Sequence, residues 1–344
     1  MNTSLLMIYT GGTIGMKQDE KSQSLVPFDF SQIESEVPEL KKFGYKIDTY
    51  SFDPVIDSSD ITPEFWIKLS NLIKDNYKKY DGFVILHGTD TMSYTASALS
   101  FMLDNLEKPI ILTGSQLPIG MLRTDGKENI ISSIEIAAAR REDGRAMVPE
   151  VCIYFESQLY RGNRTTKYNA ENFRAFRSAN CQPLAEVGIH IKYNTHLIRY
   201  PKEWGKELKV NLNLDTNIAI IRLYPGISLE VVNSIFNIKG CRAVVLETFG
   251  SGNAPTRTQF LQIIKDAIAR GIVVVNVTQC LAGSVDMKAY ATGITLDRLG
   301  VVSGYDSTIE AIVSKLFVVL GNNDDSGRVK EELTKNWRGE ISIN

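Results

Sequence analysis

The sequence predicts an α/β protein whose two domains each contain a parallel sheet. Continuous apolar runs such as 5–9 and 83–86 have the length of buried strands, which is typical of parallel sheets. Helical segments alternate with these runs through most of the chain, and βαβ units of this kind form parallel sheets. The chain has 344 residues, which is more than one hydrophobic core usually serves, so we expect two domains.

The first alternation fills 1–191 and indicates the larger, N-terminal domain. After the strand at 5–9, residues 17–27 have no periodic apolar face, and we expect a mobile loop there. Thr62 and Pro63 suit the N-cap and the first position of a helix. The other elements expected in this half are strands at 83–86, 110–112 and 151–155 and helices at 94–103 and 129–140.

The second alternation fills 216–344 and indicates a smaller C-terminal α/β domain. Between the halves, 192–215 contains Pro201, Trp204 and clusters of Asn and Lys, and we interpret it as a linker. The expected elements are strands at 218–223, 243–248 and 272–278 and helices at 228–236, 257–269, 307–320 and 327–336.

Composition argues against several classes of protein. The net charge of −2 gives no electrostatic basis for binding nucleic acid. No apolar stretch approaches the roughly 18–20 residues of a membrane span, and the N-terminus lacks a signal peptide, so we expect a cytoplasmic protein without membrane contact. The four cysteines and three histidines have no ligand spacing, which predicts reduced thiols and no zinc site.

Polar residues follow two of the predicted strands. The segment Thr10–Gly15 follows the first strand, and His87–Thr91 follows the strand at 83–86. Because ligands of parallel sheets bind beyond the carboxyl ends of the strands, both segments should face one crevice. Thr13 and Thr89 each offer a hydroxyl nucleophile there, although a Gly-Gly-Thr turn is often only structural.

A hydroxyl nucleophile needs a base, and the sequence offers a relay of Thr89, Asp90 and a lysine. Lys167 is the candidate, although a lysine in a polar segment is usually a solvated surface charge. We interpret His87 as a packing group more readily than as a base. The segment Asp57–Asp60 is either a helix-capping turn or a recognition site for the ammonium and carboxylate groups of an amino acid.

Six segments together resemble the bacterial-type L-asparaginases, specifically the cytoplasmic type I group. They lie in the order expected for that family over essentially the whole chain. The matching segments are 9–16, 57–60, 81–92, 113–116, 160–167 and 250–255.

The resemblance implies hydrolysis of L-asparagine to L-aspartate and ammonia without a metal or organic cofactor. It implies that Thr13 is the nucleophile of an acyl-enzyme and that Thr89, Asp90 and Lys167 form a second triad. The implied fold is a larger N-terminal parallel-sheet, flavodoxin-like domain and a smaller C-terminal parallel-sheet domain, assembled as a homodimer or homotetramer. The substrate-binding residues implied are Asp57, Ser58, Ser59, Thr89, Asp90, Ser115 and Asn253, of which Asn253 reaches a neighbouring subunit's site.

Two departures from the family bear on mechanism and regulation. Many members place a tyrosine in the mobile loop close to the nucleophile, and this loop has none, so we take Tyr290 as a substitute. Some type I enzymes have an allosteric asparagine pocket whose arginine corresponds to Glu247 here, while Thr166 and Cys280 match that pocket. A carboxylate does not bind the ligand's carboxylate as arginine does, so we expect allosteric activation to be altered or lost.

Two other functions remain open. The amidase subunit of a tRNA-dependent amidotransferase shares the threonine motifs but carries an additional N-terminal domain, whereas the first strand here begins near residue 4. A non-catalytic amino-acid sensor with an asparaginase-like crevice is compatible with the missing loop tyrosine. The sequence does not set the ratio of asparaginase to glutaminase activity. Glutamine is longer than asparagine by one methylene, and a binding pocket discriminates between such substrates by only about 1–3 kcal/mol.

Overall fold

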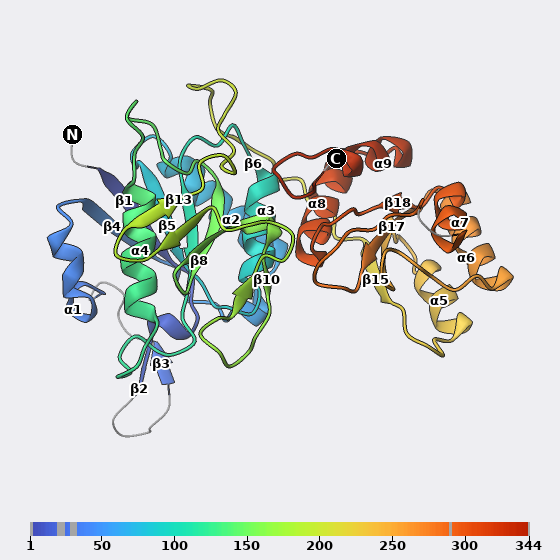
Figure 1. Cartoon of the computed structure of the whole chain (residues 1–344), viewed down its shortest axis with the longest axis horizontal. Helices are drawn as coiled ribbons and strands as arrows, with labels where there is room; N and C mark the ends of the chain where they lie inside the picture. The colour runs from blue at the N-terminus through green and yellow to red at the C-terminus, as the bar shows by residue number, and fades with distance from the viewer. Residues whose placement is uncertain (1–2, 19–24, 28–32, 289–290, 343–344) are drawn as a thin grey trace. The chain divides into compact units, whose positions relative to one another are not determined.

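The structure, a computed structural model, describes residues 3–18, 25–27, 33–288 and 291–342. It divides into two compact units, Met1–Val210 and Asn211–Asn344 (Figure 1). The division falls inside 192–215, the segment that the sequence indicates as a linker.

Five parallel strands form the core of the first unit, and they confirm the expected α/β architecture. They are β1 (Ser4–Tyr9), β4 (Lys46–Ser51), β5 (Gly82–Leu86), β7 (Ile110–Thr113) and β8 (Val151–Phe155). Across the sheet they lie in the order β4-β1-β5-β7-β8. This is the 2-1-3-4-5 order of flavodoxin-like folds, in which the strand order reverses at β1 and β5 and ligands bind at that edge.

Antiparallel strands extend this sheet beyond β8, which the sequence pattern did not predict. They are β9 (Gln158–Arg161), β12 (Ala185–Val187) and β13 (Ile191–Tyr193). Glu156 and Ser157 have φ values of 45° and 64° and turn the chain back directly after β8. A tight turn of this kind joins antiparallel neighbours, so the parallel pattern ends here.

Helices cover the parallel strands. They are α2 (Pro63–Asn76), α3 (Met92–Met102) and α4 (Gly126–Ala138). Thr62 is the N-cap of α2, as predicted. Alternate residues of β1 (Leu5, Met7, Tyr9) share one hydrophobic core with Ile130 and Ile134 of α4. Figure 1 shows strands of the sheet between α4 and the pair α2–α3.

Small antiparallel pairs complete the first unit. They are β2 (Met16–Gln18) with β3 (Leu25–Pro27), β6 (Leu103–Asp104) with β14 (Lys209–Val210), and β10 (Thr166–Lys167) with β11 (Phe176–Arg177). The pair β2–β3 lies largely within 17–27, where a mobile loop is expected, and Gln18 pairs with Leu25. Residues 19–24 lie outside the described residues. The short helix α1 (Ile33–Glu36) lies between β3 and β4 in the chain.

The second unit is a parallel sheet in the simple order β15-β16-β17-β18. Its strands are β15 (Ile218–Arg222), β16 (Ala243–Thr248), β17 (Val273–Thr278) and β18 (Val302–Ser303). Its helices are α5 (Leu229–Phe236), α6 (Thr258–Ala269), α7 (Ala291–Leu299), α8 (Ile309–Asn322) and α9 (Ser326–Thr334). The structure confirms all the strands and helices expected in this half, and α7 and β18 are additional.

Candidate active site

Glycines bring the loops after β1 and β5 into direct contact. A Cβ atom on Gly12 would lie 2.5 Å from the Cα of Gly88, and Gly12 has φ of 91°, which L side chains rarely adopt. Gly12 therefore has no room for a side chain. Thr13 follows in a 3-10 turn, Thr13–Gly15, and its side chain is half-buried. The two threonine segments thus meet at the reversal of strand order, as the sequence predicts.

The segment Asp57–Asp60 joins the same edge of the sheet. A Cβ atom on Gly88 would lie 2.5 Å from the Oγ of Ser58, so the loop after β5 packs directly on this segment. The hydroxyl of Thr91 also donates to the Ser58 carbonyl at 2.6 Å. Ser58 is buried, whereas Asp57 and Ser59 are exposed.

Lys167 contacts both Thr89 and Asp90. Its Nζ donates to the Oγ1 of Thr89 at 2.8 Å and to the Oδ1 of Asp90 at 2.6 Å. The Lys167 side chain is only 19% exposed, whereas that of Asp90 is 63% exposed. The alternative of a solvated surface lysine therefore does not hold, and the three predicted residues lie together.

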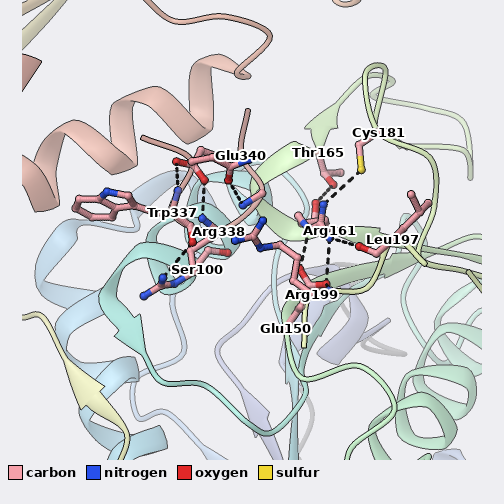
Figure 2. Close-up of polar contacts among 12 residues, drawn as sticks. Ser100, Glu150, Arg161, Thr165, Cys181, Leu197, Arg199, Trp337, Arg338 and Glu340 are labelled. Carbon is pink, nitrogen blue, oxygen red and sulfur yellow. Dashed lines mark hydrogen bonds and ion pairs between the residues drawn. The ribbon is translucent and has the colours of Figure 1, made fainter. Parts of the chain in front are cut away.

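A buried ion pair anchors the chain just before Lys167 (Figure 2). Arg161 donates from Nε to Glu150 Oε2 at 2.7 Å and from Nη2 to Glu150 Oε1 at 3.1 Å, and both residues are buried. The backbone N–H of Arg199 donates to the same carboxylate at 2.7 Å. Thr165 caps this corner by donating to the Arg161 carbonyl at 2.7 Å. Charged pairs with this many hydrogen bonds hold a fixed geometry. The segment that leads into β10 is therefore held in place.

Asp57 carries a negative charge at neutral pH. The backbone N–H and the hydroxyl of Ser59 both donate to its Oδ1 at 2.8 Å. These two hydrogen bonds hold the pKa of Asp57 below its usual range, because they favour the ionised form. An exposed carboxylate in this position suits the binding of an ammonium group.

Ser115 and Gln116 follow β7 at the same edge. The Ser115 hydroxyl donates to the Leu117 carbonyl at 2.5 Å, so this hydroxyl forms a hydrogen bond within its own loop. Gln116 Oε1 lies 3.5 Å from the Thr89 hydroxyl. No role was predicted for Gln116 from the sequence. Its position in the loop after a parallel strand indicates the edge of the sheet where ligands bind.

Two predicted residues belong to other parts of the chain. Asn253 lies in the second unit, where its Oδ1 accepts a hydrogen bond from the Thr292 hydroxyl at 2.5 Å. Tyr290, the expected substitute for the loop tyrosine, lies outside the described residues. The predictions for these two residues stay predictions.

Within the described ranges, no group of three or more His, Cys, Asp or Glu side chains is placed to hold a metal ion. Over the same residues, no helix is both long and apolar enough to cross a membrane.

Comparisons with known proteins match both halves of the chain. The family models described as "Asparaginase, N-terminal" and "Glutaminase/Asparaginase C-terminal domain" match residues 4–199 and 217–333. L-asparaginase 1 of Escherichia coli strain K12 is 44% identical over 341 residues, which cover 98% of each chain. The crystal structure of L-asparaginase I from Vibrio cholerae superimposes with a TM-score of 0.89 at 41% identity and covers 100% of both chains.

A relative with a different name shares the same region. A glutamyl-tRNA(Gln) amidotransferase component of Pyrococcus horikoshii is 33% identical over 345 residues, covering 98% of this chain and 76% of that protein. The family models and the Escherichia coli relative extend over nearly the whole chain, and the two-unit α/β fold agrees with them. The chain therefore belongs to the asparaginase family.

Proposed function

We propose that the protein hydrolyses L-asparagine to L-aspartate and ammonia through an acyl-enzyme on Thr13. The observation that carries this proposal is the position of Lys167 Nζ, 2.8 Å from Thr89 and 2.6 Å from Asp90, at the edge where Gly12, the neighbour of Thr13, packs on Gly88. A hydroxyl nucleophile and a lysine–threonine relay at the same edge of the sheet are groups that can perform amide hydrolysis through an acyl-enzyme.

The reaction has two steps. The Thr13 hydroxyl oxygen attacks the side-chain amide carbon of asparagine, the carbon–nitrogen bond breaks, and the amide nitrogen leaves as ammonia with the hydroxyl proton. Water then attacks the aspartyl ester, releases aspartate and returns a proton to Thr13. In the second step Thr89 takes the proton of the attacking water and passes its own to the unprotonated amine of Lys167, and the same proton returns through Thr89 to Thr13 as the ester breaks.

The rest of the site binds the substrate and stabilises the transition state. Asp57 binds the α-ammonium group, and the hydroxyls of Ser58 and Ser59 bind the α-carboxylate. Backbone N–H groups near Gly12, Thr89 or Asp90 stabilise the oxyanion, because the glycine-lined contact leaves backbone exposed to the substrate.

Replacing Thr13 tests the nucleophile. In Thr13→Ala, ammonia release from L-asparagine should fall by on the order of 10³-fold or more, because no acyl-enzyme forms. Thr13→Ser keeps a hydroxyl and should retain part of the activity. L-glutamine and D-asparagine, assayed in parallel, measure the substrate range. Near-normal activity in Thr13→Ala would overturn the assignment.

Replacing Lys167 tests the relay. Lys167→Met removes the base without adding a charge, and kcat should fall by about 10²–10⁴-fold, the usual contribution of general base catalysis. Lys192→Met changes an exposed lysine of β13 and should leave kcat unchanged. Asparagine binding by the unaltered protein without ammonia release would favour the amino-acid sensor instead.

We also propose a cytoplasmic homodimer or homotetramer in which Asn253 reaches the site of a neighbouring subunit. The proposal follows from membership of the family and from the motif at 250–255. Analytical ultracentrifugation of the purified protein tests it, and a monomer at assay concentration would contradict it.

A further inference from the structure

The side chain of Gln116 links the loop after β7 to the hairpin that carries Lys167. Its Nε2 donates to the carbonyls of Ala170 and Asn172, each at 3.1 Å. Its Oε1 faces the Thr89 hydroxyl at 3.5 Å. One amide group therefore contacts both the β10–β11 loop and the threonine of the proposed relay.

The hydrogen-bond partners fix the orientation of this amide. Carbonyl oxygens only accept hydrogen bonds, so the amino group of Gln116 must face Ala170 and Asn172, and its oxygen must face Thr89. The Thr89 hydroxyl then donates toward Gln116, while its oxygen accepts from Lys167 at 2.8 Å. The Thr89 hydroxyl thus lies between a donor on the hairpin and an acceptor on the loop after β7.

The backbone on the Gln116 side is held firmly. The N–H groups of Gln116 and Leu117 donate to the Asp125 carboxylate at 3.0–3.1 Å. Asn129, buried on α4, donates to the Gly114 carbonyl at 3.0 Å. The turn that carries Gln116 is therefore tied to the N-terminal half of α4.

The hairpin tip on the other side has hydrogen bonds of its own, because Asn169 Oδ1 accepts from the N–H groups of Glu171 and Asn172, each at 2.8 Å. The strands β10 and β11 pair over only two residues each, and an isolated two-stranded hairpin is marginally stable. The tip and the loop after β7 together line a hollow of about 530 Å³, formed by Gln116, Leu117, Arg123 and 170–173. The Arg174–Glu156 ion pair is exposed, with the Arg174 side chain 79% exposed, and ion pairs in water contribute little to stability.

We propose that Gln116 is a positioning residue that sets the place of Lys167 relative to Thr89 by tying down the hairpin tip. This inference rests on the proposed relay of Thr89, Asp90 and Lys167. Arg161 and Glu150 fix the root of the hairpin, and Gln116 fixes the tip. A misplacement of about 1 Å in a catalytic group can cost on the order of 10²-fold in rate. The hydrogen bonds from Gln116 to the hairpin tip should therefore affect kcat.

The substitution Gln116→Met tests the proposal, because methionine has similar length and makes no amide hydrogen bonds. We expect kcat to fall by about 10–100-fold, with KM changed by less than about 3-fold, because the Asp57–Ser59 recognition segment is not on the hairpin. Amide hydrogen exchange over 168–175 should accelerate, while exchange in β1 and β5 stays unchanged. Unchanged exchange over 168–175 would overturn the proposal.

Two further variants separate alternative roles. Gln116→Glu keeps an oxygen toward Thr89 but loses both donors to the hairpin, so it should resemble Gln116→Met. Near-normal kcat in Gln116→Glu would overturn the positioning role in favour of a direct effect on Thr89. Gln262→Met, the same change at an exposed glutamine of α6 in the second unit whose amide donates to Asp266, should leave kcat and exchange over 168–175 unaltered. Because exchange is measured without substrate, it tests the tie even if the unaltered protein releases no ammonia.

Discussion

At the scale of single residues, His87 is a buried neutral imidazole beside the proposed site. The Trp66 Nε1–H donates to Thr95 at 3.0 Å, and Thr95 contacts His87 Nε2 at 2.9 Å. Nδ1 lies 2.6 Å from the Gly88 carbonyl, which only accepts, so Nδ1 carries the proton and Nε2 accepts from Thr95. This arrangement supports the interpretation of His87 as a packing group. Burial lowers the pKa of His87 to about 4, although the Gly88 hydrogen bond raises it in part.

The low pKa of His87 predicts a pH-dependent stability. Between pH 6.5 and about 4 the unfolded chain binds a proton that the folded chain does not, so stability falls as pH falls. The slope from this group is at most about 1.4 kcal/mol per pH unit. In His87→Gln this part of the slope should disappear, as measured by urea unfolding from about pH 7 to about pH 4.5. His190→Gln, at an exposed position, should keep the original slope, and equal slopes in all three proteins would contradict the prediction.

The residues of the candidate site differ in how far the sequence could predict them. Thr13, Thr89 and Asp90 follow buried strands, so the sheet alone brings them to one edge. The burial of Lys167 could not be read from its polar neighbours, because it depends on residues 77 and 78 positions away in the chain. Gln116 contacts carbonyls 54 and 56 positions away, and a polar loop residue gives no local sign of such partners.

At the scale of elements, burial decides what the sequence could predict. The central strands are buried on both faces, so their apolar runs were evident, and capping residues marked the start of α2. The polar edge strand β4 was missed because all six of its residues are exposed or half-buried. The hairpin β8–β9 was missed because Glu156 and Ser157 both adopt positive φ, which residues other than glycine seldom do.

The ion pair that anchors β9 predicts a large stability effect. In Glu150→Leu the buried guanidinium of Arg161 loses its partner, and removing one member of such a pair typically costs about 3–5 kcal/mol. Burial alone would lower the pKa of Arg161, but the Glu150 carboxylate raises it above its usual range, so Arg161 stays charged in the folded protein. The free energy of unfolding in urea measures the cost.

Two control variants show whether that cost comes from the unpaired buried charge. The double variant Glu150→Leu with Arg161→Met removes both charges and should be more stable than Glu150→Leu alone. Arg174→Met breaks an exposed pair and should cost less than about 1 kcal/mol. A loss in Glu150→Leu no larger than that in Arg174→Met would show that the buried pair does not stabilise the fold.

At the scale of the whole molecule, strand order explains why residues far apart in sequence form one site. Thr13 and Thr89 lie beyond β1 and β5, the two strands between which the order of the sheet reverses. The alternation of strands and helices predicted a parallel sheet but not this order, which depends on how the crossovers pack. The two-domain division was evident because the strand–helix alternation stops and restarts around 192–215.

The second unit predicts how the enzyme responds to asparagine. Glu247 on β16 pairs in register with Arg222 on β15, and Arg222 Nη1 lies 3.4 Å from Glu247 Oε1. The Glu247 side chain is 13% exposed, so a carboxylate with its own partner occupies the position where the resemblance places an arginine. The α-carboxylate of a second asparagine would meet a like charge there, which disfavours binding.

We therefore expect hyperbolic kinetics. Initial velocity against asparagine concentration should fit a Hill coefficient of about 1. If no second asparagine binds near Glu247, there is no coupling free energy between that position and the active site. Isothermal titration of Thr13→Ala with asparagine should show one site per chain. Adding Glu247→Gln to this variant removes only the charge, and a second binding event in the same titration would show that charge repulsion alone blocks the second site. A sigmoidal velocity curve or a second binding event in the protein with Glu247 would show that the carboxylate does not abolish activation.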